Sequence, residues 1–224
     1  MELYDAMRTT FAARAFTDDD VPDEVVHRLL DHARFAPSGG NRQGWKVIVV
    51  REGATKKRLG ELCLPALRIA AAQTKAGEVY WQAVTPTSVD VAAAAADTSL
   101  PIFVPMFEHL DQVPVVLIVA VDLRMVASMD KDLDRVGVVS GGSIYPFAWN
   151  VLLAARNEGY GGALTTLLAT AEPAAQELLG LEAHEAVAAM LVLGKPTKQL
   201  TKLRRKPVEE FAFRERADGE PFTV

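Results

Sequence analysis

The stretch Ala36–Trp45, with the sequence APSGGNRQGW, separates an amphipathic helical pattern from a run of β-branched residues. Pro37 is expected to end the preceding helix, while Gly39 and Gly40 permit backbone conformations and close approaches that a Cβ would prevent. The polar side chains of the stretch supply hydrogen-bonding groups at short range: Ser38, Asn41, Arg42 and Gln43. Such a stretch is either an ordinary polar turn, which has the same composition, or a site for a flat polar ligand.

The segments on either side of this turn predict a sheet covered by helices. From Pro22 to Ala36, apolar residues recur at three- and four-residue spacing, which predicts the helix before the turn. Runs typical of buried strands lie at Lys46–Val50, Pro114–Asp122 and Val187–Gly194, and a strand-like segment at Ala163–Leu168. Further helices are predicted at residues 55–74, 139–158 and 173–179, with Gly159 and Gly180 as C-caps. We therefore predict a three-layer α/β or α+β arrangement.

Length and composition favour a protein that binds a small molecule. The chain has 224 residues, half of them hydrophobic, which suits one domain better than two. Its net charge is −5 and its charges are interspersed, so neither a nucleic acid nor an anionic membrane is indicated as a partner. The N-terminus lacks the pattern of a secretory signal, and we expect a cytoplasmic protein. The most apolar helical stretch, Ile144–Ala155, is shorter than the roughly 20 residues of a membrane span.

The reactive side chains argue against several kinds of chemistry. Cys63 lies between Leu62 and Leu64 and is expected to be a packed apolar thiol. The four histidines are scattered without the spacing of metal ligands, so no metal is expected. The segment Gly159–Gly162 follows a helical pattern and lacks the spacing of a dinucleotide-binding fingerprint. Motifs of hydrolases and kinases are also missing.

Two segments are less regular than the rest. Residues 75–111 are interrupted by prolines around a short helix at Ala92–Ala96, as in an insertion that forms a lid. Their aromatic side chains either pack in the core or an interface, the commoner role, or line a pocket for an aromatic substrate: Tyr80, Trp81, Phe103 and Phe107. The polar tail after Pro196 carries three aromatic residues that a partner surface is expected to cover: Phe211, Phe213 and Phe222.

Basic residues gather at both ends of the chain. Arg8 and Arg14 lie near the start, and a second cluster lies near the end: Lys198, Lys202, Arg204, Arg205 and Lys206. Two or three guanidinium groups can hold a phosphate dianion without a glycine-rich loop. The clusters are therefore either separate solvated surfaces or, if the two ends meet, one phosphate clamp.

Taken in order, these pieces resemble the FMN-dependent nitroreductase family. Arg14–Phe16 is similar to the family's R-x-F element, and Val21–Pro22 and Ala36–Trp45 follow it as in the family's helix and polar turn. Later segments continue the match in the same order: Tyr145–Ala155, Gly159–Gly161, Thr165–Leu168, Gly194–Pro196 and Arg204–Pro207.

The resemblance implies one α+β domain over residues 1–224. It would be a three-layer α/β/α sandwich with a mostly antiparallel or mixed sheet, in an intertwined homodimer. Residues 75–111 would be a variable lid-like insertion, and residues 197–224 an extension that embraces the partner. One FMN would bind in each of two sites at the dimer interface.

The implied FMN-binding residues come from three parts of the chain. The phosphate would lie against basic residues from both ends: Arg8, Arg14, Lys202, Arg204 and Arg205. The flavin edge would meet the polar turn, supplied by the opposite subunit: Pro37, Ser38, Gly39 and Asn41. The flavin ring would lie near the backbone of Thr165, Thr166 and Leu167, with the N–H groups of the last two toward N5 and O4.

The implied activity is hydride transfer from NADH or NADPH through flavin N5 to a small oxidised acceptor such as a nitroaromatic or a quinone. The flavin performs this chemistry, so no catalytic side chain is required. Two alternatives remain. The same fold could serve dehalogenation or the processing of flavins or deazaflavins, or the protein could bind flavin without turnover.

The sequence departs from the family pattern at two places. Thr10, Phe11 and Ala12 stand where family members carry arginine, often two, and a serine, so part of the phosphate clamp is missing. Either Arg8 or a hydrogen bond from Thr10 is expected to substitute, with weaker FMN binding as the consequence. Gly44 replaces the usual proline of the turn, which adds backbone freedom without removing a ligand group.

Overall fold

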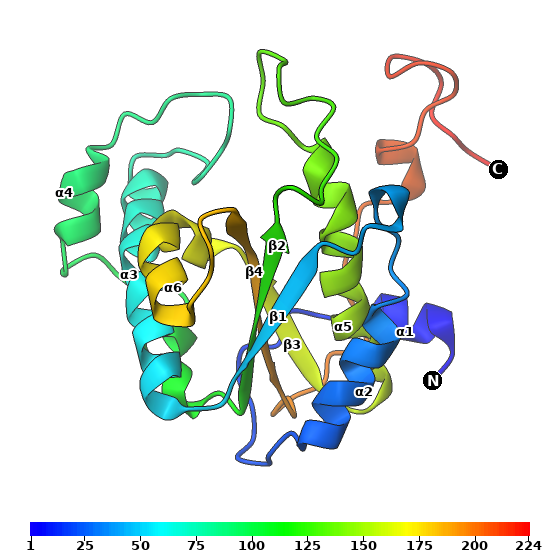
Figure 1. Ribbon diagram of the computed structural model, residues 1–224. Coiled ribbons are helices and arrows are strands. Elements are labelled where there is room, and N and C mark those ends of the chain that lie inside the picture. The colour runs from blue at the N-terminus through cyan, green and yellow to red at the C-terminus, as the bar shows by residue number, and fades with distance from the viewer.

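The computed structural model describes residues 1–224, and its centre is a four-stranded sheet in the order β1-β2-β4-β3 (Figure 1). The strands are β1 (Trp45–Val50), β2 (Val115–Asp122), β3 (Gly161–Thr165) and β4 (Glu185–Gly194), and every neighbouring pair is antiparallel. The central strands β2 and β4 are almost wholly buried. The three apolar runs are therefore confirmed as strands, but β1 lies at an edge of the sheet and is only partly buried, unlike the buried strand that was predicted. The predicted strand-like segment coincides with β3 only up to Thr165, since Leu167 begins a 3₁₀ segment.

Helices cover both faces of the sheet. On one face lie α3 (Gly53–Lys75) and α6 (Glu172–Leu179), and on the other α2 (Asp23–Ala33) and α5 (Tyr145–Asn157) (Figure 1). Successive residues of β2 point to opposite faces, as in any strand, so Leu117 packs with α2 and α5 while Ile118 packs with α3. The predicted three-layer α+β fold is confirmed.

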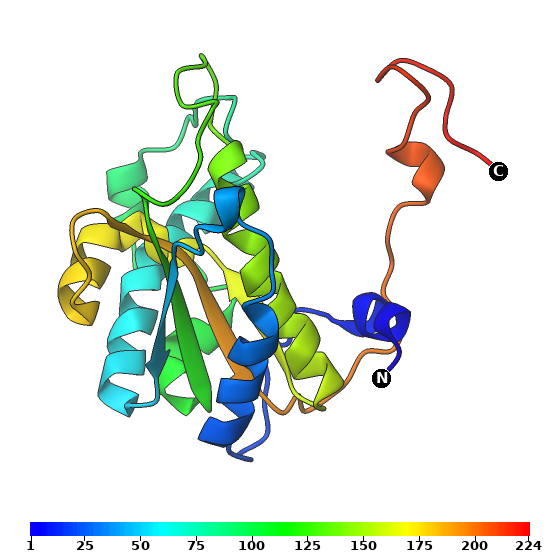
Figure 2. The same ribbon diagram turned by 45° about the vertical axis from the view of Figure 1, so that its right-hand side comes forward.

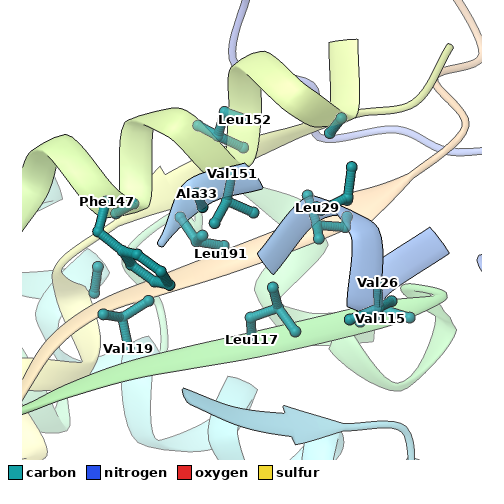
Figure 3. Close-up of a cluster of buried hydrophobic side chains, with 14 of the residues drawn as sticks. Val26, Leu29, Ala33, Val115, Leu117, Val119, Phe147, Val151, Leu152 and Leu191 are labelled. Carbon is teal, nitrogen blue, oxygen red and sulfur yellow. The ribbon is translucent and has the colours of Figure 1, made fainter. Parts of the chain in front are cut away.

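The core between the sheet and α2 fixes the position of the polar turn. Leu29 of α2, Val151 of α5 and Leu117 of β2 are fully buried and meet in this layer (Figure 3). Complete burial of one such side chain contributes about 1.5–3 kcal/mol. Because α2 is held along its length, the turn that follows it enters the sheet at a defined place.

Three details differ from the sequence prediction. The single helix expected over residues 139–158 is divided, because a 3₁₀ segment at Val139–Ser143 ends at Ile144, which has non-helical dihedral angles, and α5 begins only at Tyr145. Pro146 lies in the first turn of α5, where its missing N–H costs no hydrogen bond. The short helix α1 (Leu3–Thr9) was not predicted, and α2 ends three residues before Ala36.

Residues 75–111 and the C-terminal tail have little regular structure. Residues 75–111 contain α4 (Val91–Ala96), as predicted, which packs beside α3, and a 3₁₀ segment begins at Pro105 (Figure 1). The tail leaves the sheet-and-helix body and extends away from it (Figure 2). It contains a 3₁₀ turn at Val208–Glu210 and a bridge between Phe213 and Pro221, and its three phenylalanines are exposed.

Gly159 and Gly180 have φ of 83° and 66°, the left-handed conformation expected directly after a helix. Cys63 is fully buried in α3, and burial raises the pKa of its thiol to about 12. No group of three or more His, Cys, Asp or Glu side chains is placed to hold a metal ion. None of the helices combines the length and the apolar character needed to cross a membrane.

Candidate functional site

A short extension of the sheet brings Arg14 to the outer edge of β3. Ala12 forms a parallel bridge with Gly162, and the Ala13 N–H donates to the Gly162 carbonyl oxygen at 2.9 Å. A side chain at Gly162 would overlap the Val192 carbonyl oxygen of β4, so only glycine fits this position. Arg14 therefore lies next to the end of β3, although well over a hundred residues separate the two in sequence.

A cavity of about 440 Å³ opens at this end of β3. Its polar wall contains Arg14, Thr165, Thr166 and the backbone of Leu167, and the rest of its lining is mainly apolar. The cavity thus brings together the three residues expected at the flavin ring and Arg14, which was expected at the FMN phosphate. Arg14 is its one charged side chain.

The backbone at Thr165–Leu167 leaves the sheet without continuing a ladder. The Leu167 N–H meets the Thr165 hydroxyl oxygen at 3.3 Å, which is long for an N–H···O hydrogen bond. Leu167 then begins a 3₁₀ segment, Leu167–Ala171. A ligand with a better acceptor would replace the weak contact at little cost.

The two ends of the chain meet at another cavity, of about 460 Å³, which we call the cationic cavity. Arg8, Lys202 and Arg205 line it together with Met7, Thr201 and Leu203. Gln199 holds the tail across α1, since its side-chain amide donates to the Thr9 carbonyl oxygen at 3.0 Å. The three cations form none of the ion pairs of the chain, and three unpaired like charges favour an anion as ligand.

Three of the predicted basic residues thus share one cavity, and two lie elsewhere. Arg14 lines the cavity at β3 and not this one. Arg204 lines neither, and its carbonyl oxygen accepts a hydrogen bond of 2.7 Å from Arg205. Thr10 is buried, and its hydroxyl donates to the Ala6 carbonyl oxygen at 2.7 Å, so its hydrogen is engaged within α1.

The polar turn is organised largely by its own hydrogen bonds. The Ser38 hydroxyl accepts from the Gln43 N–H at 3.0 Å, and the Gly39 N–H donates to the Ser143 hydroxyl at 3.0 Å. Asn41 has a positive φ of 54°, a conformation that asparagine tolerates better than most residues. The Asn41 side-chain oxygen accepts from the Gln43 side-chain amide at 3.2 Å, so this side chain is held within the turn.

Gly44 has a local reason to replace the usual proline. A Cβ at this position would lie 2.6 Å from the Cβ of Met125, in the segment that follows β2. The Asp122 N–H also donates to the Gly44 carbonyl oxygen at 2.9 Å, which fixes the backbone there. Gly44 and Met125 are therefore matched, and proline would collide.

Within one chain, the turn and the cavity lie at opposite edges of the sheet. Trp45 of β1 pairs with Val121 of β2, while Thr165 of β3 pairs with Met190 of β4. Two strands separate β1 from β3, which places the edges about 14 Å apart, three strand spacings. The turn of the same chain therefore does not complete the cavity.

The aromatic residues of the insertion are the part of the site that sequence reasoning placed least well. Core packing, the commoner role, holds for the buried Phe107 alone. Tyr80, Trp81 and Phe103 are 52%, 44% and 48% exposed and line the cavity, as does Phe107. The sequence signal for this role was the pair Tyr80–Trp81, which lies in a segment with no helical or strand pattern that could bury the two rings. The contribution of α3 to the wall, through Leu67 and Ala70, carried no signal of its own.

The chain belongs to the nitroreductase family, whose model, described as the Nitroreductase family, matches residues 7–195. An NADH dehydrogenase of Thermus thermophilus is 28% identical over 196 residues, which are 88% of this chain and 87% of that protein. Among solved structures, a BluB-like flavoprotein of Clostridium difficile 630 has a TM-score of 0.69 at 23% identity and covers 95% of this chain and 98% of its own. Oxidised iodotyrosine deiodinase, bound to FMN and 3-iodo-L-tyrosine, has a TM-score of 0.64 at 18% identity and covers 92% and 96%. The family resemblance of the sequence is confirmed.

Proposed function

We propose that the protein is an FMN-dependent oxidoreductase that takes hydride from NADH or NADPH and passes it to a nitroaromatic, a quinone or a similar oxidised acceptor. The observation that carries this proposal is the cavity at the end of β3, where Arg14, the Thr165–Leu167 backbone and an aromatic wall meet. Membership of the nitroreductase family supports it. FMN, when bound, would supply the hydride chemistry itself.

The residues present fit the phosphate end of FMN. Arg8, Lys202 and Arg205 form an unpaired cationic cavity, which suits a phosphate dianion. Arg204, which adjoins Arg205 in the sequence, would add charge, whereas Arg14 lines the other cavity. The Thr10 hydroxyl donates to the Ala6 carbonyl oxygen within α1, so we assign Thr10 to holding the end of that helix and not to direct contact with the phosphate.

The residues at the end of β3 fit the flavin ring. The N–H groups of Thr166 and Leu167 are the donors we assign to N5 and O4, beside Thr165. Donors there stabilise the negative charge that grows on the ring as it is reduced, so they favour electron uptake. Arg14 lines the same cavity, and its positive charge would stabilise the reduced ring in the same way.

A homodimer would complete the site. The turn that carries Pro37, Ser38, Gly39 and Asn41 lies at the far edge of its own sheet, so the partner's copy is the one we assign to the flavin edge. The exposed aromatic side chains of the tail would be covered in the same assembly: Phe211, Phe213 and Phe222.

Dehalogenation in the manner of iodotyrosine deiodinase is the second candidate, because that enzyme shares the fold. Its ligand, 3-iodo-L-tyrosine, carries an ammonium and a carboxylate. The cavity here has Arg14 as its one charged side chain and offers no carboxylate to an ammonium. A neutral or anionic aromatic acceptor fits it better.

The test is to purify the protein with FMN and follow the flavin absorbance as NADH and NADPH are added in turn, then to supply a quinone. Bleaching by a nicotinamide and recovery with the quinone are expected. A protein that neither retains nor quenches added FMN would refute the proposal. Flavin that binds but is reduced by neither nicotinamide would favour the second candidate or a non-catalytic flavin-binding protein.

A further inference from the structure

We propose that Trp81 sets the size of the acceptor, as the wall between the cavity at β3 and a second cavity inside the lid, and that Glu78 and Gln73 are positioning residues for it. This inference rests on the proposed function and deepens it. The acceptors it predicts are flat aromatic molecules, neutral or anionic, whose extent beyond the flavin site is limited by one indole ring.

Trp81 is the residue at which two hollows meet. It lines the cavity at the end of β3, of about 440 Å³, and also an open cavity of about 330 Å³ lined by the loop of residues 78–87. The second cavity is closed on its inner side by Ile69 and Gln73 of α3. Removing the indole would therefore join two spaces that the ring now separates.

The backbone at Trp81 is held in an uncommon conformation. Its φ is 55°, in the left-handed region that bulky residues seldom adopt without support. Support comes from Gln73, which is buried in the last turn of α3 and whose side-chain oxygen accepts from the Trp81 N–H at 3.2 Å. The Gln73 carbonyl oxygen also accepts from the Glu78 N–H at 2.9 Å. The strained residue is thus tied to a helix of the core.

The loop behind Trp81 is closed by one carboxylate. Glu78 accepts from the Thr87 hydroxyl at 2.6 Å, the Ser88 N–H at 2.8 Å and the Ser88 hydroxyl at 2.6 Å. These three bonds join the two ends of the loop that lines the second cavity. Since Glu78 makes them without touching the cavity at β3, we assign it a positioning role.

The lining of the cavity at β3 defines the ligand chemistry. Tyr80, Trp81 and Phe103 all line this cavity, and the rings of Tyr80 and Phe103 have centroids 6.0 Å apart and planes inclined by 47°. Threonines and Arg14 form its polar side. Aromatic walls of this kind favour stacked planar ligands. A nitrobenzoate or a small quinone fits this description, and a fused multi-ring quinone would extend into the space that Trp81 occupies.

The first experiment compares acceptors of two sizes, para-benzoquinone and a three-ring quinone, with the FMN-loaded protein. Trp81→Ala is expected to raise the kcat/KM ratio of large to small acceptor by about tenfold, and Trp81→Phe by less. An unchanged ratio in Trp81→Ala, with turnover retained, would overturn the inference and leave the proposed function intact. A wild-type protein that reduces neither quinone would instead refute the proposed function.

A second readout needs no turnover. Titrating 4-nitrobenzoate into the oxidised protein, with no nicotinamide present, should change the tryptophan fluorescence until the site is saturated. Trp81→Phe should remove most of that change, whereas Trp149→Phe, the matched loss of an indole on α5, should keep it. A full response in Trp81→Phe would show that the indole does not face the acceptor.

The positioning residues are tested by a split between binding and turnover. Glu78→Gln is expected to raise the acceptor KM severalfold with little change in kcat or FMN affinity, and Thr87→Val with Ser88→Ala should reproduce the effect. The three changes together should cost no more than either alone, because they break the same bonds. Glu177→Gln, on the exposed face of α6, is the control. An unaltered KM in Glu78→Gln, or an equal loss of FMN affinity, would contradict the positioning role.

Discussion

The floor and the wall of the cavity are built by different kinds of interaction. The floor, at Arg14 and Thr165–Leu167, is set by main-chain pairing of β3 with β4 and with the segment at Ala12. The wall, at residues 78–107, is set by side-chain hydrogen bonds from Gln73 and Glu78. Main-chain pairing tolerates most substitutions, whereas a side-chain bond is lost with a single residue. Most single substitutions should therefore affect the floor less than the wall, except at close-packed positions such as Gly162.

The largest effect should come from breaking the floor. Gly162→Val would force a side chain into the Val192 carbonyl oxygen and the Leu193 side chain, and we expect a loss of about 3 kcal/mol or more of the free energy of unfolding, since β4 cannot yield. Urea unfolding measures it. Gly53→Ala, at an open position in α3, should change stability by less than about 1 kcal/mol. Equal stabilities of the two variants would show that β4 can move.

Next in size is the loss of the cationic cavity. Arg205→Ala should weaken FMN binding by roughly 1.5–3 kcal/mol, the range for removing a charged hydrogen-bonding partner. Flavin fluorescence quenching gives the affinity. Arg58→Ala, which removes the same charge on α3 in a pair with Glu61, should leave it unchanged. If Arg205→Ala binds FMN as the wild type does, the tail is wrongly assigned.

At low pH the loop held by Glu78 should open, which raises the acceptor KM, before the backbone pairing of the floor is affected. The hydrogen bonds of Ser88 and Thr87 lower the pKa of Glu78, so the carboxylate form holds the loop closed. That contribution is complete above the ordinary glutamate pKa, about 4.3, and is lost as the pH falls through the lowered value. The acceptor KM should be flat from about pH 8 to 5 and rise only once the pH falls below about 4.3. Glu78→Gln should lack this rise, and a rise of the same size in that variant would assign it to another group.

The smallest effect is expected at Cys63, which lies in the core beneath both regions. Burial raises the pKa of its thiol to about 12, so the thiolate is scarce at neutral pH and solvent does not reach it. A disulfide reagent should leave the folded protein unmodified over hours and react with one thiol per chain in denaturant. Rapid modification of the folded protein would show that α3 opens from the sheet.

Much of the fold was predictable from local pattern. The runs that became β2 and β4 were recognisable because strands at the centre of a sheet are apolar on both faces. The run of β1 is equally apolar, but its place at an edge of the sheet was not visible in the sequence. The break at Ile144 was missed although Gly141, Gly142 and Pro146 are local signals for it, because the strongly apolar run after Pro146 dominated the helical pattern. The basic residues were visible as charges, but only the path of the tail along α1 separates Arg205 from Arg204.

The sequence alone determined the family and the layers of the fold and supplied the candidate segments for the site, because periodicity and short motifs are properties of neighbouring residues. The tertiary structure decided which segments meet: Arg14 with β3, Arg8 with Arg205, Gly44 with Met125, and Trp81 between two cavities. Such pairs are distant along the chain, or depend on the shape of a loop, and are set by sheet register and packing. No local pattern contains that information.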